Sequence, residues 1–141
     1  MTQTTQRTYP VQRSAINPWS WSLQFGFNQA ELVEGHTRTL FCAGQSSVDA
    51  DGAPQHPGDM AGQLTLTLDN LETVLAAGGM TLSDVVRLTI YTTDVDAILP
   101  HYGILGARLA GAGVMPAATL LGVARLAFPE MLLEIEATAV R

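Results

Sequence analysis

Two glutamates near the C-terminus, Glu134 and Glu136, are the residues of this chain best suited to do chemistry. They alternate with Leu133 and Ile135 in a pattern typical of a half-buried β-strand. Because successive side chains of a strand point to opposite faces, the two carboxylates should share one face of a sheet. A carboxylate held in this way can act as a general base toward water. The alternative interpretation is a pair of solvated strand carboxylates without a chemical role.

The other reactive or aromatic side chains stand apart from this pair in the sequence. Cys42 has no neighbouring base or cation, which favours a buried strand thiol over an activated nucleophile. The segment from Asp49 to Gly52 resembles part of a calcium loop, but the later glutamate that such a loop needs is missing, so we expect no metal site. Trp19 and Trp21 follow an Asn-Pro step and can wall a pocket, or pack on the sheet or on a neighbouring subunit.

The charged residues exclude several classes of function. All seven basic residues are arginines, and without lysine the chain cannot form a Schiff base, anchor pyridoxal phosphate or carry a phosphate-loop lysine. The formal charge of −6 argues against a nucleic-acid partner, because that affinity comes mainly from neutralised phosphates. The single cysteine fits a reducing compartment, and no signal peptide or membrane span is visible, so we expect a cytoplasmic protein without a membrane partner.

The elements that position these residues follow from apolar periodicity. We expect a disordered tail over residues 1–6 and a single domain over residues 7–141. A stripe of leucines at three- and four-residue steps favours a helix rather than a strand after Asp59. The last two strands are predicted to form a hairpin that closes the sheet. The predicted order is β, β, β, α, β, α, β, β, over residues 7–13, 23–29, 38–43, 59–77, 85–93, 95–110, 119–126 and 131–140.

This order predicts an α+β fold with a mixed β-sheet and both helices on one face. The opposite face of the sheet is then bare. The chain is 47% hydrophobic and only 14% charged, so a monomer of this size would leave much apolar surface exposed. We therefore expect the bare face to be covered by self-association.

Four sequence blocks carry a resemblance to a known family. They are QLTLTLDNLETVLAAGG at 63–79, DVVRLTIYTTD at 84–94, PAATLLGVARL at 116–126 and LLEIEATAVR at 132–141. Over nearly its whole length the chain resembles the Rid family (YjgF-type reactive intermediate deaminases, RidA-like). The resemblance implies a chorismate-mutase-like fold and a homotrimer with small-molecule sites in the clefts between subunits. It also implies hydrolysis of reactive enamines and imines to keto compounds and ammonia, with no metal or cofactor.

The resemblance assigns site roles to several positions. Glu134 matches the carboxylate that positions or activates water in the family. Trp19 matches a tyrosine that walls the pocket, Gly44 matches the glycine of a Ser-Gly-Gln turn that meets the ligand, and His101 falls where an asparagine is common. His101 could exchange a proton near neutral pH, or be an ordinary surface histidine at the start of a helix.

One departure from the family pattern concerns the ligand most directly. Deaminases of the family have a Pro-Ala-Arg-(Ser/Thr) motif whose arginine holds the substrate carboxylate. Here the motif reads Pro116-Ala117-Ala118-Thr119, so Ala118 stands at the position of that arginine and Thr119 matches the Ser/Thr position. Losing that pair would weaken binding of the same substrate by about 2 to 5 kcal/mol. Arg38, Arg87 and Arg108 are candidate replacements for the missing arginine. For Arg125 we expect a structural ion pair instead.

Two functions of different classes therefore remain open. The first is a metal-independent hydrolase of enamines or imines with an altered substrate. The second is a trimeric protein of the same family that binds a small metabolite without turnover, which the changes at Ala43, Trp19 and Ala118 favour. A third reading, ribonuclease, is a label associated with this family, and the acidic charge gives it little support.

Overall fold

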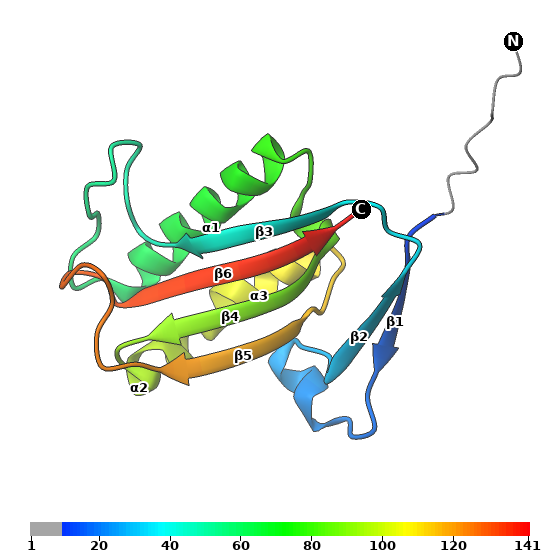
Figure 1. Cartoon of the computed structure of the whole chain (residues 1–141). Helices are drawn as coiled ribbons and strands as arrows, with labels where there is room; N and C mark the ends of the chain where they lie inside the picture. The colour runs from blue at the N-terminus through cyan, green and yellow to red at the C-terminus, as the bar shows by residue number, and fades with distance from the viewer. Residues whose placement is uncertain (1–9) are drawn as a thin grey trace, which may run out of the picture.

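The computed structural model describes residues 10–141, and its centre is a four-stranded mixed sheet (Figure 1). The strand order is β3-β6-β4-β5, in which β6 is antiparallel to both neighbours and β5 is parallel to β4. The predicted tail over residues 1–6 lies outside the described residues, as does the start of the predicted strand 7–13. The strands of the main sheet are β3 (Thr39–Gln45), β4 (Val85–Thr92), β5 (Ala117–Gly122) and β6 (Leu133–Val140).

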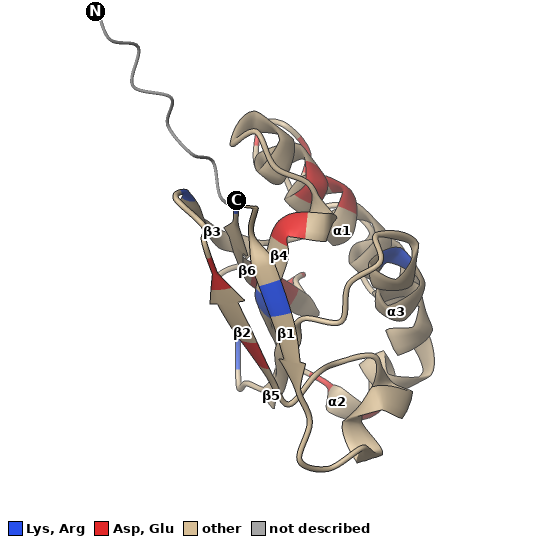
Figure 2. Cartoon of the chain, turned by 90° about the vertical axis from the view of Figure 1, so that its right-hand side faces the viewer, with Lys and Arg blue, Asp and Glu red and all other residues tan. Residues whose placement is uncertain are grey.

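Three helices cover one face of this sheet and leave the other bare, as the sequence predicts (Figure 2). The α1 helix (Met60–Ala77) is capped at its N-terminus by Asp59, whose carboxylate accepts a hydrogen bond from the amide of Gly62. Its predicted leucine stripe is buried, so the prediction of a helix rather than a strand is confirmed. No helix in residues 10–141 has the length and apolarity needed to cross a bilayer.

The second predicted helix, over residues 95–110, is interrupted. It consists of α2 (Val95–Ile98), the 3-10 turn η3 (Leu99–His101) and α3 (Tyr102–Gly111). Pro100 lies in the 3-10 turn, where its missing N–H and its ring disrupt regular helical bonding. The α+β class with helices on one face is confirmed despite this break.

The predicted C-terminal hairpin is wrong. Strands β5 and β6 are not neighbours, because β4 lies between them and pairs with both. The chain leaves β4, crosses over through α2 and α3 and returns as β5, which forms a parallel β-α-β unit. Residues 123–132 then pass beyond the end of β4, so that β6 enters the sheet on its other side. Apolar alternation marks both strands, but it does not identify their partners.

The N-terminal part of the chain also differs from the prediction. The predicted strand 23–29 is replaced by the 3-10 helix η1 (Trp21–Phe25) and the strand β2 (Ala30–Glu34). Trp21 packs edge-on against Phe25 and Phe27, and this local aromatic cluster favours a compact turn over an extended segment. The first strand is β1 (Gln12–Ile16), which pairs with β2 in a separate two-stranded sheet. The single predicted sheet is therefore two.

The small sheet is held on the main one by Arg13. Its guanidinium donates to both carboxylate oxygens of Glu31, each at 2.7 Å. It also donates to the backbone carbonyls of Ser83 and Val85, where β4 begins. The side chain of Glu31 is 5% exposed, so this ion pair is largely removed from water. One arginine thus joins β1, β2 and β4.

Replacing Glu31 with Gln should lower the free energy of unfolding by about 2 to 3 kcal/mol, because it leaves a largely buried guanidinium without its counter-charge. Urea unfolding followed by circular dichroism measures this change. The matched control is Glu72→Gln, which removes an exposed partner of Arg108 and should cost about 0.5 kcal/mol. Equal losses in the two variants would contradict the role of burial.

Candidate active site

Glu134 lies near the start of β6 on the bare face of the main sheet. Its neighbours Leu133 and Ile135 are fully buried against the helices, so the carboxylate points the other way. Glu136 and Thr138 follow on the same face. The prediction that the two glutamates share a face is thus confirmed, because β6 alternates from Leu133 to Ala139.

Gly44 lies directly against the Glu134 side chain. The pairing of β3 with β6 shifts between Cys42 and Gln45, and this irregularity brings the Gly44 backbone under the carboxylate. A Cβ atom at position 44 would lie 2.6 Å from Cδ of Glu134 and 2.8 Å from its Cγ. Only glycine therefore leaves Glu134 in this position. Among the predicted site residues, these two are the pair that the structure brings together.

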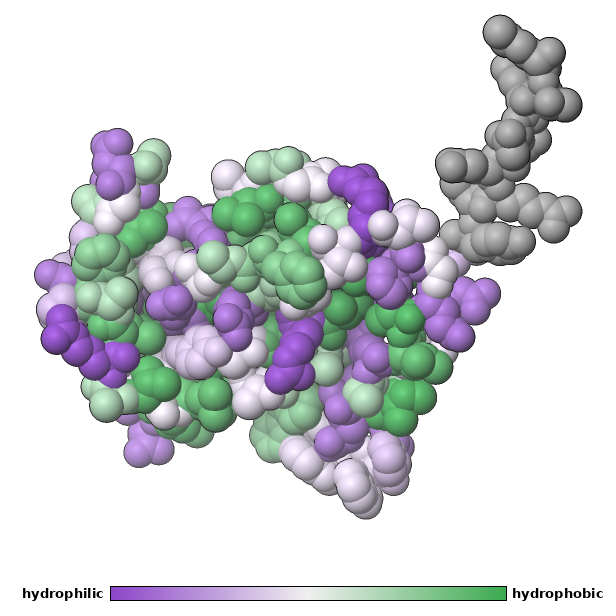
Figure 3. Space-filling model, in the orientation of Figure 1, coloured by the Kyte–Doolittle hydropathy of each residue, from purple (hydrophilic) through white to green (hydrophobic). Residues whose placement is uncertain are grey.

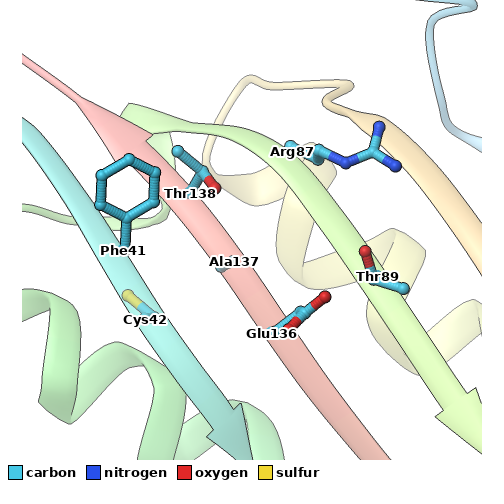
Figure 4. Close-up of a pocket in the computed structure, with 7 residues that line it drawn as sticks. All are labelled: Phe41, Cys42, Arg87, Thr89, Glu136, Ala137 and Thr138. Carbon is cyan, nitrogen blue, oxygen red and sulfur yellow. The ribbon is translucent and has the colours of Figure 1, made fainter.

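A second polar group lies two residues further along β6. The Tyr91 hydroxyl donates a 2.7 Å hydrogen bond to Oε1 of Glu136. Glu136 also borders a hollow of about 250 Å³ on the bare face, together with Phe41, Cys42, Arg87, Thr89, Ala137 and Thr138 (Figure 4). Glu136 therefore has a partner within the chain, whereas Glu134 makes no ion pair with any residue from 10 to 141.

The bond to Glu136 raises the pKa of Tyr91 above its ordinary value, because the phenolate would lose this hydrogen bond and face the carboxylate charge. The protonated tyrosine is therefore favoured in the folded protein. Any stability that this contributes is complete below the unfolded-state pKa and is lost as the pH rises through the folded-state pKa. Ultraviolet titration should show that Glu136→Gln lowers the pKa of one tyrosine, whereas an unchanged titration curve would contradict the bond.

Thr119 and Ala118 lie on opposite faces of β5. Thr119 faces the bare side, where its hydroxyl oxygen is 3.5 Å from a terminal nitrogen of Arg87. Ala118 packs against the hydrophobic core on the helix side. A side chain at position 118 therefore does not share a face with Glu134 of the same chain, so a site that used both would need two copies of the chain.

Trp19 and His101 lie away from Glu134 within the chain. Trp19 is 63% exposed and belongs to the connection between β1 and η1, beside the small sheet. Glu134 lies at the start of β6, at the opposite end of the main sheet (Figure 1). His101 ends η3 and is half-buried among the helices. The predicted pocket is therefore not assembled within one chain.

The three arginines considered as replacements differ in their partners. Arg108 pairs with Asp69 and Glu72 on α1, and Arg38 donates to the carbonyl of Gly78. Arg87 lies on the bare face and forms no ion pair with the described residues. Arg125 does not form the structural ion pair that was predicted for it with any residue from 10 to 141. Its side chain borders a hollow that Phe128 also lines.

Tyr91 and its hydrogen bond to Glu136 were not predicted from the sequence. Tyr91 follows Arg87 and Thr89 at alternate positions of a clear strand, so its place on the bare face was readable from the pattern. Its contact with Glu136 depends on strand pairing, which the sequence did not reveal.

Cys42 is buried, as expected, and burial raises the pKa of its thiol. Within residues 10–141, no three potential metal ligands cluster together.

Comparisons with known proteins agree on one family. The sequence pattern of the family described as endoribonuclease L-PSP matches residues 24–141. A solved structure from Yersinia pestis, a protein of unknown function of the conserved Rid protein family YyfB, is 38% identical with a TM-score of 0.83, over 92% of this chain and 98% of that one. RutC family protein YjgH from Escherichia coli is 33% identical over 117 residues, which cover 83% of this chain and 88% of YjgH.

A relative with a named activity matches a shorter stretch. The 2-iminobutanoate/2-iminopropanoate deaminase of Rattus norvegicus is 31% identical over 70 residues, which are 50% of this chain and 49% of the rat protein.

Proposed function

We start from the fact that this chain belongs to the endoribonuclease L-PSP family, which includes the Rid and YjgF proteins, and we propose that it hydrolyses a reactive imine or enamine to a keto compound and ammonia. The observation that carries this proposal is the Glu134 carboxylate, which faces away from the core against Gly44 and has no ion-pair partner in the described chain. The named activity of the rat relative supports the same reaction class.

Hydrolysis of a C=N bond requires a general base that activates water, and a correctly placed carboxylate can serve as that base. Glu134 takes a proton from water as the water oxygen bonds to the carbon of the C=N group, which forms a carbinolamine. Glu134 then gives this proton to the carbinolamine nitrogen, the C–N bond breaks and ammonia leaves, and the hydroxyl group loses its own proton to Glu134 or to water as the C=O bond forms. No electrons are gained or lost, and neither a metal nor an organic cofactor is needed.

The proposal includes a homotrimer with the ligand cleft between subunits. Two observations support self-association through the bare sheet face. This face carries exposed apolar side chains, among them Phe41 at 79% exposure, interspersed with hydrophilic groups (Figure 3). In addition, Trp19, His101 and Glu134 are separated within one chain, so the cleft needs a neighbouring copy. The buried Cys42 fits work in the reducing cytoplasm.

The proposed reaction can be tested with imines that are generated in situ, in the assay mixture. An amino-acid oxidase would generate the 2-imino acid continuously in the presence of semicarbazide, which traps free imine as the semicarbazone. The purified protein should lower semicarbazone formation and release the 2-oxo acid and ammonia instead. A panel of 2-imino acids with short, long and aromatic side chains defines the preferred substrate. No protection of any imine at micromolar protein would contradict the hydrolase proposal.

Ala118 favours a second candidate function, which is the binding of a small metabolite without turnover. Alanine supplies no guanidinium for a substrate carboxylate, and its Cβ packs against the core. A protein of this kind would be stabilised by uncharged apolar metabolites more than by 2-oxo acids. A thermal-shift comparison of the two compound classes decides this point, and preferential stabilisation by 2-oxo acids would contradict the second candidate.

A further inference from the structure

Gln63 is a fully buried polar side chain in the first turn of α1. Its amide nitrogen donates hydrogen bonds to the backbone carbonyls of Glu130, at 2.8 Å, and of His56, at 3.0 Å. Its amide oxygen accepts from the backbone N–H of Leu132 at 2.8 Å. Because the nitrogen meets two carbonyls and the oxygen meets an N–H, the amide fits in one orientation only.

These bonds fix the backbone directly ahead of β6. Leu132 is the last residue before that strand, and Gln63 holds its N–H. The carbonyl of Leu132 accepts from the Thr92 hydroxyl at 2.7 Å and from the Thr93 N–H at 3.1 Å. Both backbone polar groups of one residue are therefore held, one from α1 and the other from the end of β4.

Glu134 follows Leu132 by two residues and depends on this support. On one side its backbone pairs with Tyr91 of β4. On the other side the pairing of β3 with β6 shifts between Cys42 and Gln45, where Gly44 lies against the Glu134 side chain. Since regular pairing is interrupted on the β3 side, the position of Glu134 relies on β4 and on the segment that Gln63 holds.

The α1 helix is a firm support for this contact. Its leucines at positions 64, 68, 71 and 75 are all fully buried in the core. A helix packed in this way moves little relative to the sheet, because protein interiors are close-packed. Gln63 does not reach the Glu134 carboxylate itself, so any effect on Glu134 passes through the backbone of residues 130–132.

We propose that Gln63 is a positioning residue for Glu134, which fixes the start of β6 so that the carboxylate lies against Gly44. The catalytic part of this inference rests on the proposed hydrolase function. A general base must be held close to its productive geometry, and supporting hydrogen bonds of this kind provide that precision.

The first test is the variant Gln63→Met, which keeps the length of the side chain and removes all three hydrogen bonds. We expect kcat for imine hydrolysis to fall about 10-fold to 100-fold, because a displaced reacting group loses activity on this scale. KM should stay within about threefold of wild type, since Gln63 does not touch the substrate. Steady-state kinetics with imines generated in the assay mixture measure both values.

Two control variants separate positioning from general stability. Glu31→Gln destabilises the protein through Arg13 where β4 begins, level with the far end of β6, and should leave kcat unchanged. Thr67→Val lies one turn along α1, where the buried hydroxyl has no hydrogen-bond partner within residues 10–141, and should leave both kcat and the unfolding midpoint unchanged. A Gln63→Met protein with a lowered midpoint but full kcat would overturn the proposal.

A double variant shows whether Gln63 acts through Glu134. In the Glu134→Gln background, adding Gln63→Met should lower the remaining kcat by less than about twofold, because the group that Gln63 positions is already lost. A further 10-fold loss would overturn the proposal. If Gln63→Met does not fold, Thr92→Val tests the same segment, since it removes the 2.7 Å bond to the Leu132 carbonyl. It should lower kcat about 3-fold to 10-fold, and an unchanged kcat would overturn the proposal.

A measurement without substrate keeps this inference separate from the hydrolase proposal. In ¹H–¹⁵N spectra, the Gly44 amide signal should shift in Gln63→Met and stay in place in Thr67→Val, because Gly44 senses the position of Glu134 from another strand. A wild-type protein that hydrolyses no imine, together with a shifted Gly44 signal, would reject the hydrolase and support the positioning. An unchanged Gly44 signal would overturn the positioning whatever the activity.

Discussion

Replacing Glu134 with Gln should reduce imine hydrolysis by about 10² to 10⁴-fold in kcat while the protein keeps its fold. General-base catalysis by a positioned side chain contributes a factor of this size, and an amide cannot accept the proton from water. Stability should change little, because Glu134 forms no ion pair with residues 10–141. Ammonia release from imines generated in place, measured beside the thermal unfolding midpoint, checks both parts.

Glu136→Gln is the matched control for this experiment. Glu136 lies on the same strand and the same face, two residues away, but its carboxylate is bonded to the Tyr91 hydroxyl. We expect its substitution to keep kcat within about threefold of wild type. If both variants lose activity equally, the catalytic role belongs to the acidic face as a whole and not to Glu134.

Gly44→Ala should reduce imine hydrolysis by about 10²-fold, because a methyl group at position 44 displaces the Glu134 carboxylate, which we propose as the general base. The added carbon would lie 2.6 Å from Cδ of Glu134, so the side chain must rotate away. A displacement of about 1 Å in a reacting group costs activity on this scale. The obstacle is the far end of a flexible side chain, so the cost in folding should stay near 1 kcal/mol.

Gly106→Ala is the control for this second variant. A Cβ atom there meets nothing within 4 Å, and the residue lies inside α3, where alanine is the better helix former. Activity should be unchanged and the unfolding midpoint equal or slightly higher. A Gly44→Ala enzyme with full activity would show that Glu134 acts from another position or does not act.

The main elements of the fold were readable from local sequence because each depends on its own side-chain pattern. Residues 133–139 alternate between buried and partly exposed side chains, so their two faces follow from the two-residue period alone. The leucine stripe of residues 60–77 outweighed a local alternation with threonine, because a helix of that length buries the whole stripe. The aromatic segment 21–27 misled because an apolar run without a clear period fits both a strand and a compact turn.

The candidate site was only partly readable. The resemblance of the Glu134 strand to the Rid family marked the carboxylate, and that of the Ala43-Gly44-Gln45 turn marked the glycine. Their contact depends on a register shift between β3 and β6, which no local pattern encodes. The hydrogen bond between Tyr91 and Glu136 was not predicted, because it joins side chains of β4 and β6, and no local pattern encodes the pairing of these strands.

By itself, the sequence determined the α+β class, the two faces of β4 and β6, the position of α1 and the absence of lysine chemistry, because all of these depend on residue identity or on short-range periodicity. Only the tertiary structure decided that β4 separates β5 from β6. It also decided that Ala118 faces away from Glu134, and that Gly44 meets the carboxylate while Trp19 and His101 do not. These facts depend on which strands pair and in which register, and the free energy of pairing comes from contacts between residues distant in the chain.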